Sequence, residues 1–580
     1  MKFSVSIHAV FVGVGLSLMA AAMNCSKSDN PTTNSTSDAA SGSSAPSGQP
    51  NILFVLADDQ RADSAQCMAK LHSLIGSNGV NFSLNFAATP LCCPGRSSIL
   101  TGKYAHNHGV ITNGDINEGA TKVNGAEAFK DKGNEQLAFV KWLQAAGYRT
   151  ALFGKYLNGY ENQTNADENH DGKPDNYIPP YWDDWFAFPS PDYFNFQLVQ
   201  RAHTDTETKR VCYSPADGTG PTNATGSTDV ATCKKNTDSF DNSQENYATD
   251  VLKNHAINFI KTAAADKKPF FAYFAMYSPH APYQSPSRYQ VDVDSKKASF
   301  TEAATDRLKD CSLFDWNDRP KSFLEDDMTD KPEWIQANVA VDRKNQKKAD
   351  FDIMRKKQLV SVLATEDALE EMMAVLESTG QKNNTLIVYS ADNGYAWGEH
   401  WYGTKNCAYE ECSRVPLIVY DPRAPQGGTT FPGMILNVDI APTVAEWAGV
   451  KIPDGTLING MSFANIASGK STTWSRDRVL TECWGDEKGK AKGLVDTHAS
   501  ARTTKWKYIE HYVDEARTAI KTRQDGKAEI ELYDLENDPY ELDNLSIISD
   551  AQLTAKGLTR ASEQAAEAEM KAKLLQLEKD

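Results

Sequence analysis

The sequence feature that most constrains the fold is a series of short apolar segments that alternate with amphipathic helical segments. Residues 51–57 (NILFVLA) are almost continuously apolar, which is typical of a strand buried on both faces in a parallel sheet. Further strands are predicted at 148–156, 269–277, 385–390 and 415–420, with helices at 137–147, 246–262 and 359–380. This order predicts an α/β fold with a doubly wound core, in which a large, mostly parallel sheet lies between helices.

The chain changes in character past about residue 470. Residues 471–580 contain short charged segments such as TTKWKYIEH and end in a stretch rich in Ala, Glu and Lys. A chain of 580 residues is also too long for one simple core. We therefore predict a large domain at 51–470 and a smaller α+β subdomain with a terminal helix at 471–580.

The N-terminus indicates export. Residues 1–24 combine Lys2 with a largely apolar run, which predicts a signal peptide; a signal anchor that stays in the membrane is the alternative. Residues 25–50 are rich in Ser, Thr, Pro and Gly and predict a flexible tether. Cys25 at its start resembles the lipidated cysteine of bacterial lipoproteins. We expect a periplasmic or cell-envelope protein, anchored to the membrane where Cys25 carries lipid.

Charge and cysteine content narrow the partners and the compartment. The formal net charge of −17, without a long Lys/Arg stripe, argues against a nucleic-acid partner. An oxidising compartment allows disulfides. Cys212 and Cys233 flank a polar loop that a disulfide would staple, and Cys407 and Cys412 can close a small ring. No partner is evident for Cys67, Cys311 and Cys483, and spacing alone does not decide the pairing.

Two acidic pairs follow two of the predicted strands. Asp58-Asp59 comes directly after residues 51–57, and Asp392-Asn393 comes after residues 385–390. The carboxyl ends of parallel strands line the ligand crevice of such a sheet. Three carboxylates and one amide oxygen suit Ca²⁺ or Mg²⁺. Capping of the following helix explains either pair alone, whereas the two pairs together favour a cation site.

A vicinal cysteine pair opens a short helical segment. Pro94 is suited to the first turn of that helix, so Cys92 and Cys93 lie at its positive end, where anions bind. The phrase C-x-P-x-R-x-x-x-L-T-G spans Cys92, Pro94, Arg96, Leu100, Thr101 and Gly102. It resembles the signature of the type I sulfatase family.

This resemblance implies an alkaline-phosphatase-like core and a specific nucleophile. In that family a maturation enzyme oxidises the first motif cysteine to 3-oxoalanine (formylglycine), whose hydrated aldehyde attacks sulfur with one hydroxyl and expels sulfate with the other. Cys92 is then the precursor and Cys93 a variable position. A Ca²⁺ or Mg²⁺ ion would assist this chemistry. Its expected ligands are Asp58, Asp59, Cys92 as formylglycine, Asp392 and Asn393.

The resemblance covers nearly all of residues 50–546 and adds further site residues. Lys155 in FGKYLNGY, His280 in SPHAPY and Lys405 in GTKNCAYEECSRVPL match the family's sulfate-binding and leaving-group residues, beside Arg96 of the signature. Taken singly, a lysine is more often a solvated surface charge, and His280 a structural histidine. Together with the cysteine motif they favour a catalytic site.

Several segments resemble one branch of the family, the N-acetylglucosamine-6-sulfatases and heparan sulfatases. These segments are GKYLN, PPYWDDWFAF and DNGYAWGEH. Leu157 stands where many sulfatases have a histidine, and Asn158, His106 or His108 are candidates to replace its contact. Tyr181 stands where the branch usually has glycine, so we expect a different pocket shape there. Trp182, Trp185, Trp397, His400 and Trp401 are candidates for stacking on a sugar, with core packing as the alternative for each.

The sequence therefore predicts an exported sulfuric-ester hydrolase that acts on a sulfated sugar. A 6-O-sulfated N-acetylglucosamine or a related polysaccharide is the expected substrate. One alternative keeps the fold and changes the substrate to a phosphonate or phosphate monoester, which turnover of sulfate against methylphosphonate esters distinguishes. Another alternative is an unmodified, inactive lipoprotein that only binds glycans.

Overall fold

The protein is described from a computed structural model. It describes residues 48–114, 125–162, 177–213, 246–291, 298–315, 317, 319–344, 348–424, 427–485 and 495–580. The predicted signal peptide, almost all of the tether, Cys25 and Cys233 lie outside the described residues. Among the described residues, no helix combines the length and the apolar character that crossing a bilayer requires.

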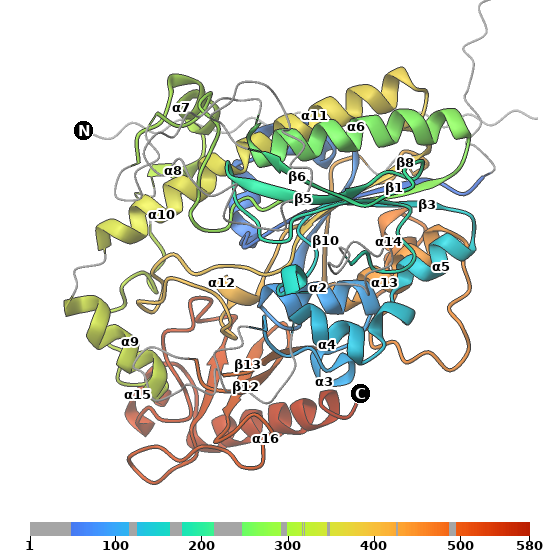
Figure 1. The fold of residues 1–580 in the computed structure, drawn as a ribbon. Coiled ribbons are helices and arrows are strands. Elements are labelled where there is room, and N and C mark those ends of the chain that lie inside the picture. Colours follow the sequence, from blue (N-terminus) through green and yellow to red (C-terminus); the bar gives the residue numbers. More distant parts are fainter. Residues whose placement is uncertain are drawn as a thin grey trace, which may run out of the picture. The chain divides into compact units, whose positions relative to one another are not determined.

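A ten-stranded sheet forms the centre of the larger part of the structure (Figure 1). Its strand order is β10-β2-β9-β8-β1-β7-β3-β4-β5-β6. The strands are β1 (Asn51–Ala57), β2 (Val80–Phe86), β3 (Arg149–Gly154), β4 (Asp184–Ala187), β5 (Phe196–Arg201), β6 (Lys209–Tyr213), β7 (Phe270–Ala275), β8 (Thr385–Ala391), β9 (Leu417–Tyr420) and β10 (Thr429–Leu436). The central strands β8, β1, β7, β3 and β4 are parallel, while β9, β5 and β6 run antiparallel to their neighbours. The predicted mostly parallel α/β sheet is confirmed.

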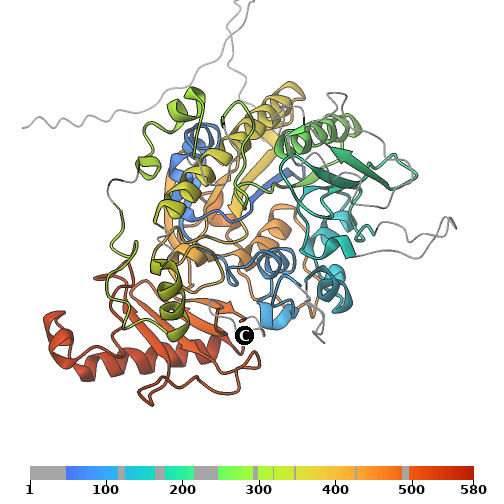
Figure 2. The same cartoon turned by 60° about the vertical axis from the view of Figure 1, so that its left-hand side comes forward.

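Helices cover both faces of this sheet (Figures 1 and 2). The long helices α6 (Ala248–Asp266) and α11 (Leu363–Ser378) lie on one face. On the other face lie α2 (Cys92–Thr101), α4 (Gly125–Asp131), α5 (Phe139–Ala145), α13 (Ile440–Trp447) and α14 (Ala464–Ala467). The remaining helices of this part are α1 (Ala69–Leu74), α3 (Ala105–His108), α7 (Glu302–Leu308), α8 (Ser312–Asp315), α9 (Glu333–Lys344), α10 (Lys348–Ser361) and α12 (Glu410–Ser413).

The burial of β1 explains its apolar sequence. Successive side chains of a strand point to opposite faces of the sheet. Ile52, Phe54 and Leu56 pack into the core beneath α5 and α13, whereas Leu53 and Val55 pack into the core beneath α6 and α11. All five side chains are fully buried. A polar side chain at any of these five positions would be buried between two layers of helices, where water could not hydrogen-bond to it.

A second, smaller sheet lies near the C-terminus. Its antiparallel strands are β11 (Val479–Cys483), β12 (His498–Arg502), β13 (Trp506–His511) and β14 (Ile530–Asp534), in that order. The helices α15 (Asp550–Ala555) and α16 (Arg560–Leu577) follow it, and α16 contributes Met570 and Leu574 to the core over this sheet. The predicted C-terminal α+β subdomain with a terminal helix is confirmed, and the boundary at residue 470 stays a prediction.

Two disulfides join described cysteines. Cys407 and Cys412 close the small ring that the sequence suggested. Cys67 pairs with Cys311, 244 residues away, a separation too long for spacing to reveal. Cys212 is also disulfide-bonded, but the predicted partner, Cys233, lies outside the described residues.

Core packing accounts for most of the aromatic side chains that were candidates for sugar stacking. Trp182, Trp185, Trp397 and His400 are all at most 5% exposed. Trp185 packs against Tyr156, Tyr160 and Trp182, and its indole nitrogen donates to the Tyr160 hydroxyl at 2.9 Å. Trp401 is partly exposed, and its indole nitrogen donates to the Glu325 carbonyl.

We expect Trp185→Ala to lower the free energy of unfolding by about 3–5 kcal/mol, because it leaves a large cavity in this aromatic cluster. Chemical denaturation monitored by circular dichroism measures the change. Trp401→Ala, at a partly exposed position, is the matched control and should cost less. A loss of less than about 1 kcal/mol for Trp185→Ala would contradict its assignment to the core.

Candidate active site

The predicted site residues follow four neighbouring parallel strands. β8, β1, β7 and β3 lie side by side in that order, so their carboxyl ends meet at one edge of the sheet. This edge is where ligands bind in open α/β sheets. The structure brings together there the side chains of Asp58, Asp59, Lys155, His280, Asp392 and Asn393.

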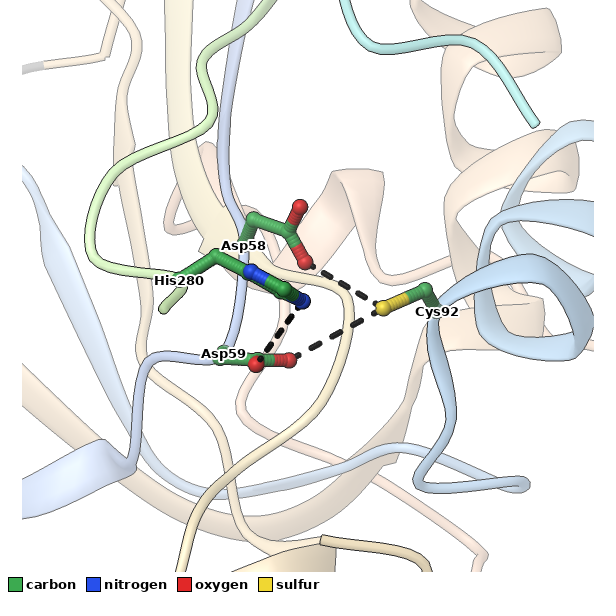
Figure 3. Close-up of side chains that lie close together, drawn as sticks. All are labelled: Asp58, Asp59, Cys92 and His280. Carbon is green, nitrogen blue, oxygen red and sulfur yellow. Dashed lines mark hydrogen bonds and ion pairs between the residues drawn. The ribbon is translucent and has the colours of Figure 1, made fainter. Parts of the chain in front are cut away.

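Four side chains form the centre of the site, and their ligand atoms lie within 4.8 Å of one another (Figure 3). They are Asp58, Asp59, Cys92 and His280. The Cys92 thiol points from the start of α2 toward the two carboxylates, with Sγ 3.3 Å from Asp58 Oδ1 and 3.8 Å from Asp59 Oδ1. His280 Nε2 lies 3.6 Å from Asp59 Oδ2.

A backbone feature lets both neighbouring carboxylates face the same centre. Side chains alternate between faces along a strand, so Asp58 and Asp59 would diverge if β1 simply continued. Asp59 instead has a φ of 68°, in the left-handed region. Aspartate tolerates this conformation better than most residues.

The two adjacent cysteines have different surroundings. Cys92 begins α2 and faces the carboxylates, whereas Cys93 packs in the apolar core with Ile99 and Leu100. The Cys93 amide donates to Asn113 Oδ1 at 2.9 Å. Burial raises the pKa of the Cys93 thiol to about 12. Only Cys92 is therefore oriented toward the polar centre.

Two lysines neutralise the buried carboxylates. Lys155 Nζ lies 2.5 Å from Asp58 Oδ2, and Lys405 Nζ donates to both Asp59 Oδ1 and the Cys92 sulfur, the latter at 2.7 Å. Burial alone would raise the pKa of Asp58, but the positive charges of Lys155, Arg96 and Lys405 hold it well below its usual range. Asp58 is thus charged, and its charge is compensated within the site.

Arg96 connects the two ends of the site. Its Nε donates to Asp392 Oδ2 at 2.8 Å and its Nη1 to the Lys155 carbonyl at 2.7 Å. Asp392 in turn accepts from the Asp59 amide at 3.1 Å. Burial and the nearby charge of Asp58 raise the pKa of Asp392 to about 6, against the opposing effect of Arg96. The fully buried guanidinium therefore holds Asp392 and Lys155 in place.

The donor set fits a hard divalent cation. Asn393 Nδ2 donates to Asp59 Oδ1 at 2.8 Å, while its Oδ1 is buried and has no hydrogen-bond partner among the described residues. An orphaned amide oxygen beside three carboxylates is the oxygen-rich environment that Ca²⁺ and Mg²⁺ prefer. The residues that could hold the ion are Asp58, Asp59, Asp392 and Asn393.

The segment that carries Lys405 is supported by the C-terminal sheet. Glu410, at the start of α12, forms ion pairs with Arg502 at 3.2 Å and with Lys507 at 2.9 Å. The neighbouring Tyr409 hydroxyl donates to Glu531 Oε2 at 2.8 Å. The smaller subdomain therefore helps to hold Lys405 over the site.

The remaining predicted substrate contacts lie elsewhere. His106 Nδ1 is 2.9 Å from Glu482 Oε1, and His108 is buried with Nε2 3.1 Å from Ser98 Oγ. His400 Nδ1 is 2.7 Å from Glu325 Oε2. Asn158 is partly exposed and accepts a bond from the Ala126 amide. Within the described structure no hydrogen bond or ion pair joins these four to the central cluster, so their roles stay predictions.

Sequence reasoning did not single out Tyr283 and Tyr395, which flank the site. Their hydroxyl oxygens lie 2.9 Å apart. Both residues belong to segments already quoted, SPHAPY and DNGYAWGEH. The signal that could have indicated them is therefore an aromatic residue shortly after a predicted site residue in each segment.

Two family models match the chain. The model described as Sulfatase matches residues 50–450. The model described as N-sulphoglucosamine sulphohydrolase, C-terminal, matches residues 398–568. Together they span the large sheet, the site and the smaller subdomain.

Several curated relatives carry the same name. N-acetylglucosamine-6-sulfatase from Capra hircus is 27% identical over 546 residues, which cover 89% of this chain and 83% of the relative. The protein of that name from Homo sapiens is 26% identical, with 89% of this chain and 84% of the relative covered. N-acetylglucosamine-6-O-sulfatase from Bacteroides thetaiotaomicron is 26% identical, with 86% and 82% covered.

Solved structures share the fold. A protein solved in complex with its substrate D-glucosamine-2-N,6-O-disulfate superposes with a TM-score of 0.57 at 24% identity, covering 90% of this chain and 98% of that one. The phosphonate monoester hydrolase of Agrobacterium radiobacter superposes with a TM-score of 0.58 at 18% identity, covering 91% and 95%.

We expect Ca²⁺ to raise the Tm of metal-depleted protein, because a ligand of the folded state stabilises it by about 2.7 kcal/mol at a hundredfold excess over Kd. Asp59→Asn removes one ligand charge and should abolish most of this shift. Asp63→Asn, which removes a nearby acid outside the cluster, is the control and should keep it. Differential scanning fluorimetry measures all three proteins, and an undiminished shift in Asp59→Asn would refute the assignment.

Proposed function

The chain belongs to the sulfatase family and is a sulfuric ester hydrolase, and on that premise we propose that it removes 6-O-sulfate from N-acetylglucosamine or a related sulfated polysaccharide. The names of the relatives from goat, human and Bacteroides thetaiotaomicron support this substrate. The observation that carries the proposal is the position of Cys92, whose sulfur faces Asp58, Asp59 and Lys405 at the start of α2.

We propose that a maturation enzyme converts Cys92 to formylglycine. The hydrated aldehyde would supply a nucleophilic oxygen at the position of the Cys92 sulfur. A Ca²⁺ or Mg²⁺ ion held by Asp58, Asp59, Asp392 and Asn393 would supply positive charge beside the sulfate. The remaining contributions to catalysis would come from the side chains of Lys155, Lys405, Arg96 and His280.

Lys155 and Lys405 provide fixed positive charge where sulfate binds. Both ammonium groups are already oriented by buried carboxylates, so they need no rearrangement when substrate enters. Arg96 holds Asp392 in the same frame. Preorganised charge of this kind stabilises the negative charge that grows as the S–O bond breaks.

His280 is oriented to move a proton at Nε2. Its Nδ1 lies 2.7 Å from the Ala281 carbonyl oxygen, which only accepts hydrogen bonds. Nδ1 therefore carries a proton, and Nε2 faces the site. Burial lowers the pKa of His280 despite the opposing charges of Asp59 and Asp58, so the imidazole is neutral at pH 7 and Nε2 accepts a proton.

Export and anchoring complete the proposal. Residues 1–24 would direct secretion to the periplasm or cell envelope, and lipidated Cys25 would tether the enzyme through residues 25–50. The phosphonate monoester hydrolase of Agrobacterium radiobacter shares the fold, so a phosphonate or phosphate monoester is the second candidate substrate. The match to the sulfatase family stands against the inactive glycan-binding lipoprotein.

We expect Cys92→Ala, and Cys92→Ser made in a host that oxidises only cysteine, to have no measurable activity, because neither forms the aldehyde there. Cys93→Ala should retain at least ten times more activity and lose about 1 kcal/mol of stability, since its side chain packs in the core. Turnover of 6-O-sulfated N-acetylglucosamine and of a methylphosphonate ester measures the effect. Mass spectrometry of the Cys92 peptide detects the modification. Active Cys92 variants beside an inactive Cys93→Ala would refute the assignment.

We also expect Lys405→Ala to lower kcat/KM by roughly 10²–10³-fold, the usual effect of losing one preorganised donor. Lys451→Ala is the matched control, because that side chain is 77% exposed and, within the described residues, its ion pair is with the neighbouring Asp454. Initial rates across substrate concentrations give both values. An effect below about threefold would place Lys405 outside the catalytic machinery.

A further inference from the structure

Among the side chains of the described site, His280 and Lys405 are the most exposed to solvent. The side chains of Asp58, Arg96 and Asp392 are fully buried, and Cys92 is also at 0% exposure. Exposure rises to 11% for the Lys405 side chain and to 26% for His280. A sulfate ester that reaches Cys92 must therefore extend its alcohol part past His280 and Lys405.

Two tyrosines lie beside this opening, on the two loops that form it. The Tyr283 amide donates to the His280 carbonyl at 3.0 Å, so Tyr283 and His280 belong to one tight turn. Tyr395 comes two residues after Asn393 and is 7% exposed, whereas Tyr283 is more exposed. The hydroxyl contact of 2.9 Å between them spans the two loops.

Both hydroxyls lie within electrostatic reach of the central charges. Burial raises the pKa of Tyr283; Tyr395 and Asp59 add to this effect, and Lys405 opposes it. The Tyr283 phenol therefore stays protonated and remains a hydrogen-bond donor beside the site.

The backbone of Tyr283 is strained. Its φ is 61°, in the left-handed region that bulky residues rarely adopt. Strain of this kind persists only where the surrounding structure enforces it, and it clusters at active sites and ligand-binding sites. The tight turn therefore holds the tyrosine ring beside the opening at an energetic cost.

We propose that Tyr283 and Tyr395 contact the sugar of the substrate and determine the preference for a saccharide over other alcohols. This inference rests on the proposed function. Two phenols carry two protons, and their mutual hydrogen bond uses one. Tyr395 also makes a hydrogen bond with the Thr404 side chain. The hydrogen-bonding capacity that remains, chiefly on the more exposed Tyr283 hydroxyl, can serve neighbouring sugar hydroxyls, and the ring faces offer apolar surface to the C–H groups of a pyranose.

The experiment compares two substrates that share the sulfate and differ in the alcohol. We expect Tyr283→Phe and Tyr395→Phe each to lower kcat/KM for 6-O-sulfated N-acetylglucosamine about tenfold, the usual effect of one lost hydrogen bond. The loss in kcat/KM for an aryl sulfate, which lacks sugar hydroxyls, should be at least threefold smaller. A threefold difference is roughly the smallest that exceeds the variation expected between independent substitutions. Tyr213→Phe is the matched control. Tyr213 lies on the edge strand β6, and its hydroxyl contacts His255 of α6, so this variant should leave the activity on both substrates unchanged.

The outcomes separate the inference from the function on which it rests. If the tyrosine pair were only a brace between loops, both variants would lower the Tm and reduce both activities equally, and this result would overturn the inference alone. A wild-type enzyme that hydrolyses aryl sulfates but no sulfated sugar would overturn the proposed function and the inference together. A selective loss on the sugar substrate with an unchanged Tm would support the inference.

Discussion

Burying three carboxylates at one edge of a sheet is the constraint on which the rest of the site depends. Like charges repel strongly where water is excluded. Each carboxylate accordingly has a cationic partner: Lys155 for Asp58, Lys405 for Asp59 and Arg96 for Asp392. Removing one partner of a buried pair typically costs 3–5 kcal/mol. The lysines that compensate the buried carboxylates are also the positive charges that would contact a bound sulfate ester.

This constraint extends to the C-terminal subdomain. Lys405 lies two residues before the ring that the Cys407–Cys412 disulfide closes, and this ring contains the first residues of α12. Glu410 connects α12 to β12 and β13 through Arg502 and Lys507. In the part of the chain that the structure describes, this subdomain contributes no side chain to the central cluster, yet it helps to position Lys405, the proposed catalytic charge. The strand edge alone would not fix a lysine that arrives from a long loop.

Local sequence patterns predicted those features that depend on neighbouring residues. The apolar run at 51–57 predicted β1 because burial on both faces leaves no polar position, and the motif around Cys92 predicted the side chain at the start of α2 that faces the carboxylates. Contacts between distant segments carry no such pattern. The Cys67–Cys311 disulfide, the Tyr283–Tyr395 pair and the His106–Glu482 contact join residues far apart in the chain. Their geometry follows from how the strands are ordered in the sheet, which the spacing of residues does not encode.

The left-handed backbone at Asp59 has a consequence for how the enzyme can change over generations. The position must supply a charge and must also tolerate a φ of 68°. Glycine and asparagine satisfy the second demand without the first, whereas glutamate satisfies the first at a conformational cost. The backbone conformation and the carboxylate charge therefore both restrict which residues can replace Asp59. A descendant that lost activity through this position while keeping its fold is expected to carry Asn or Gly there.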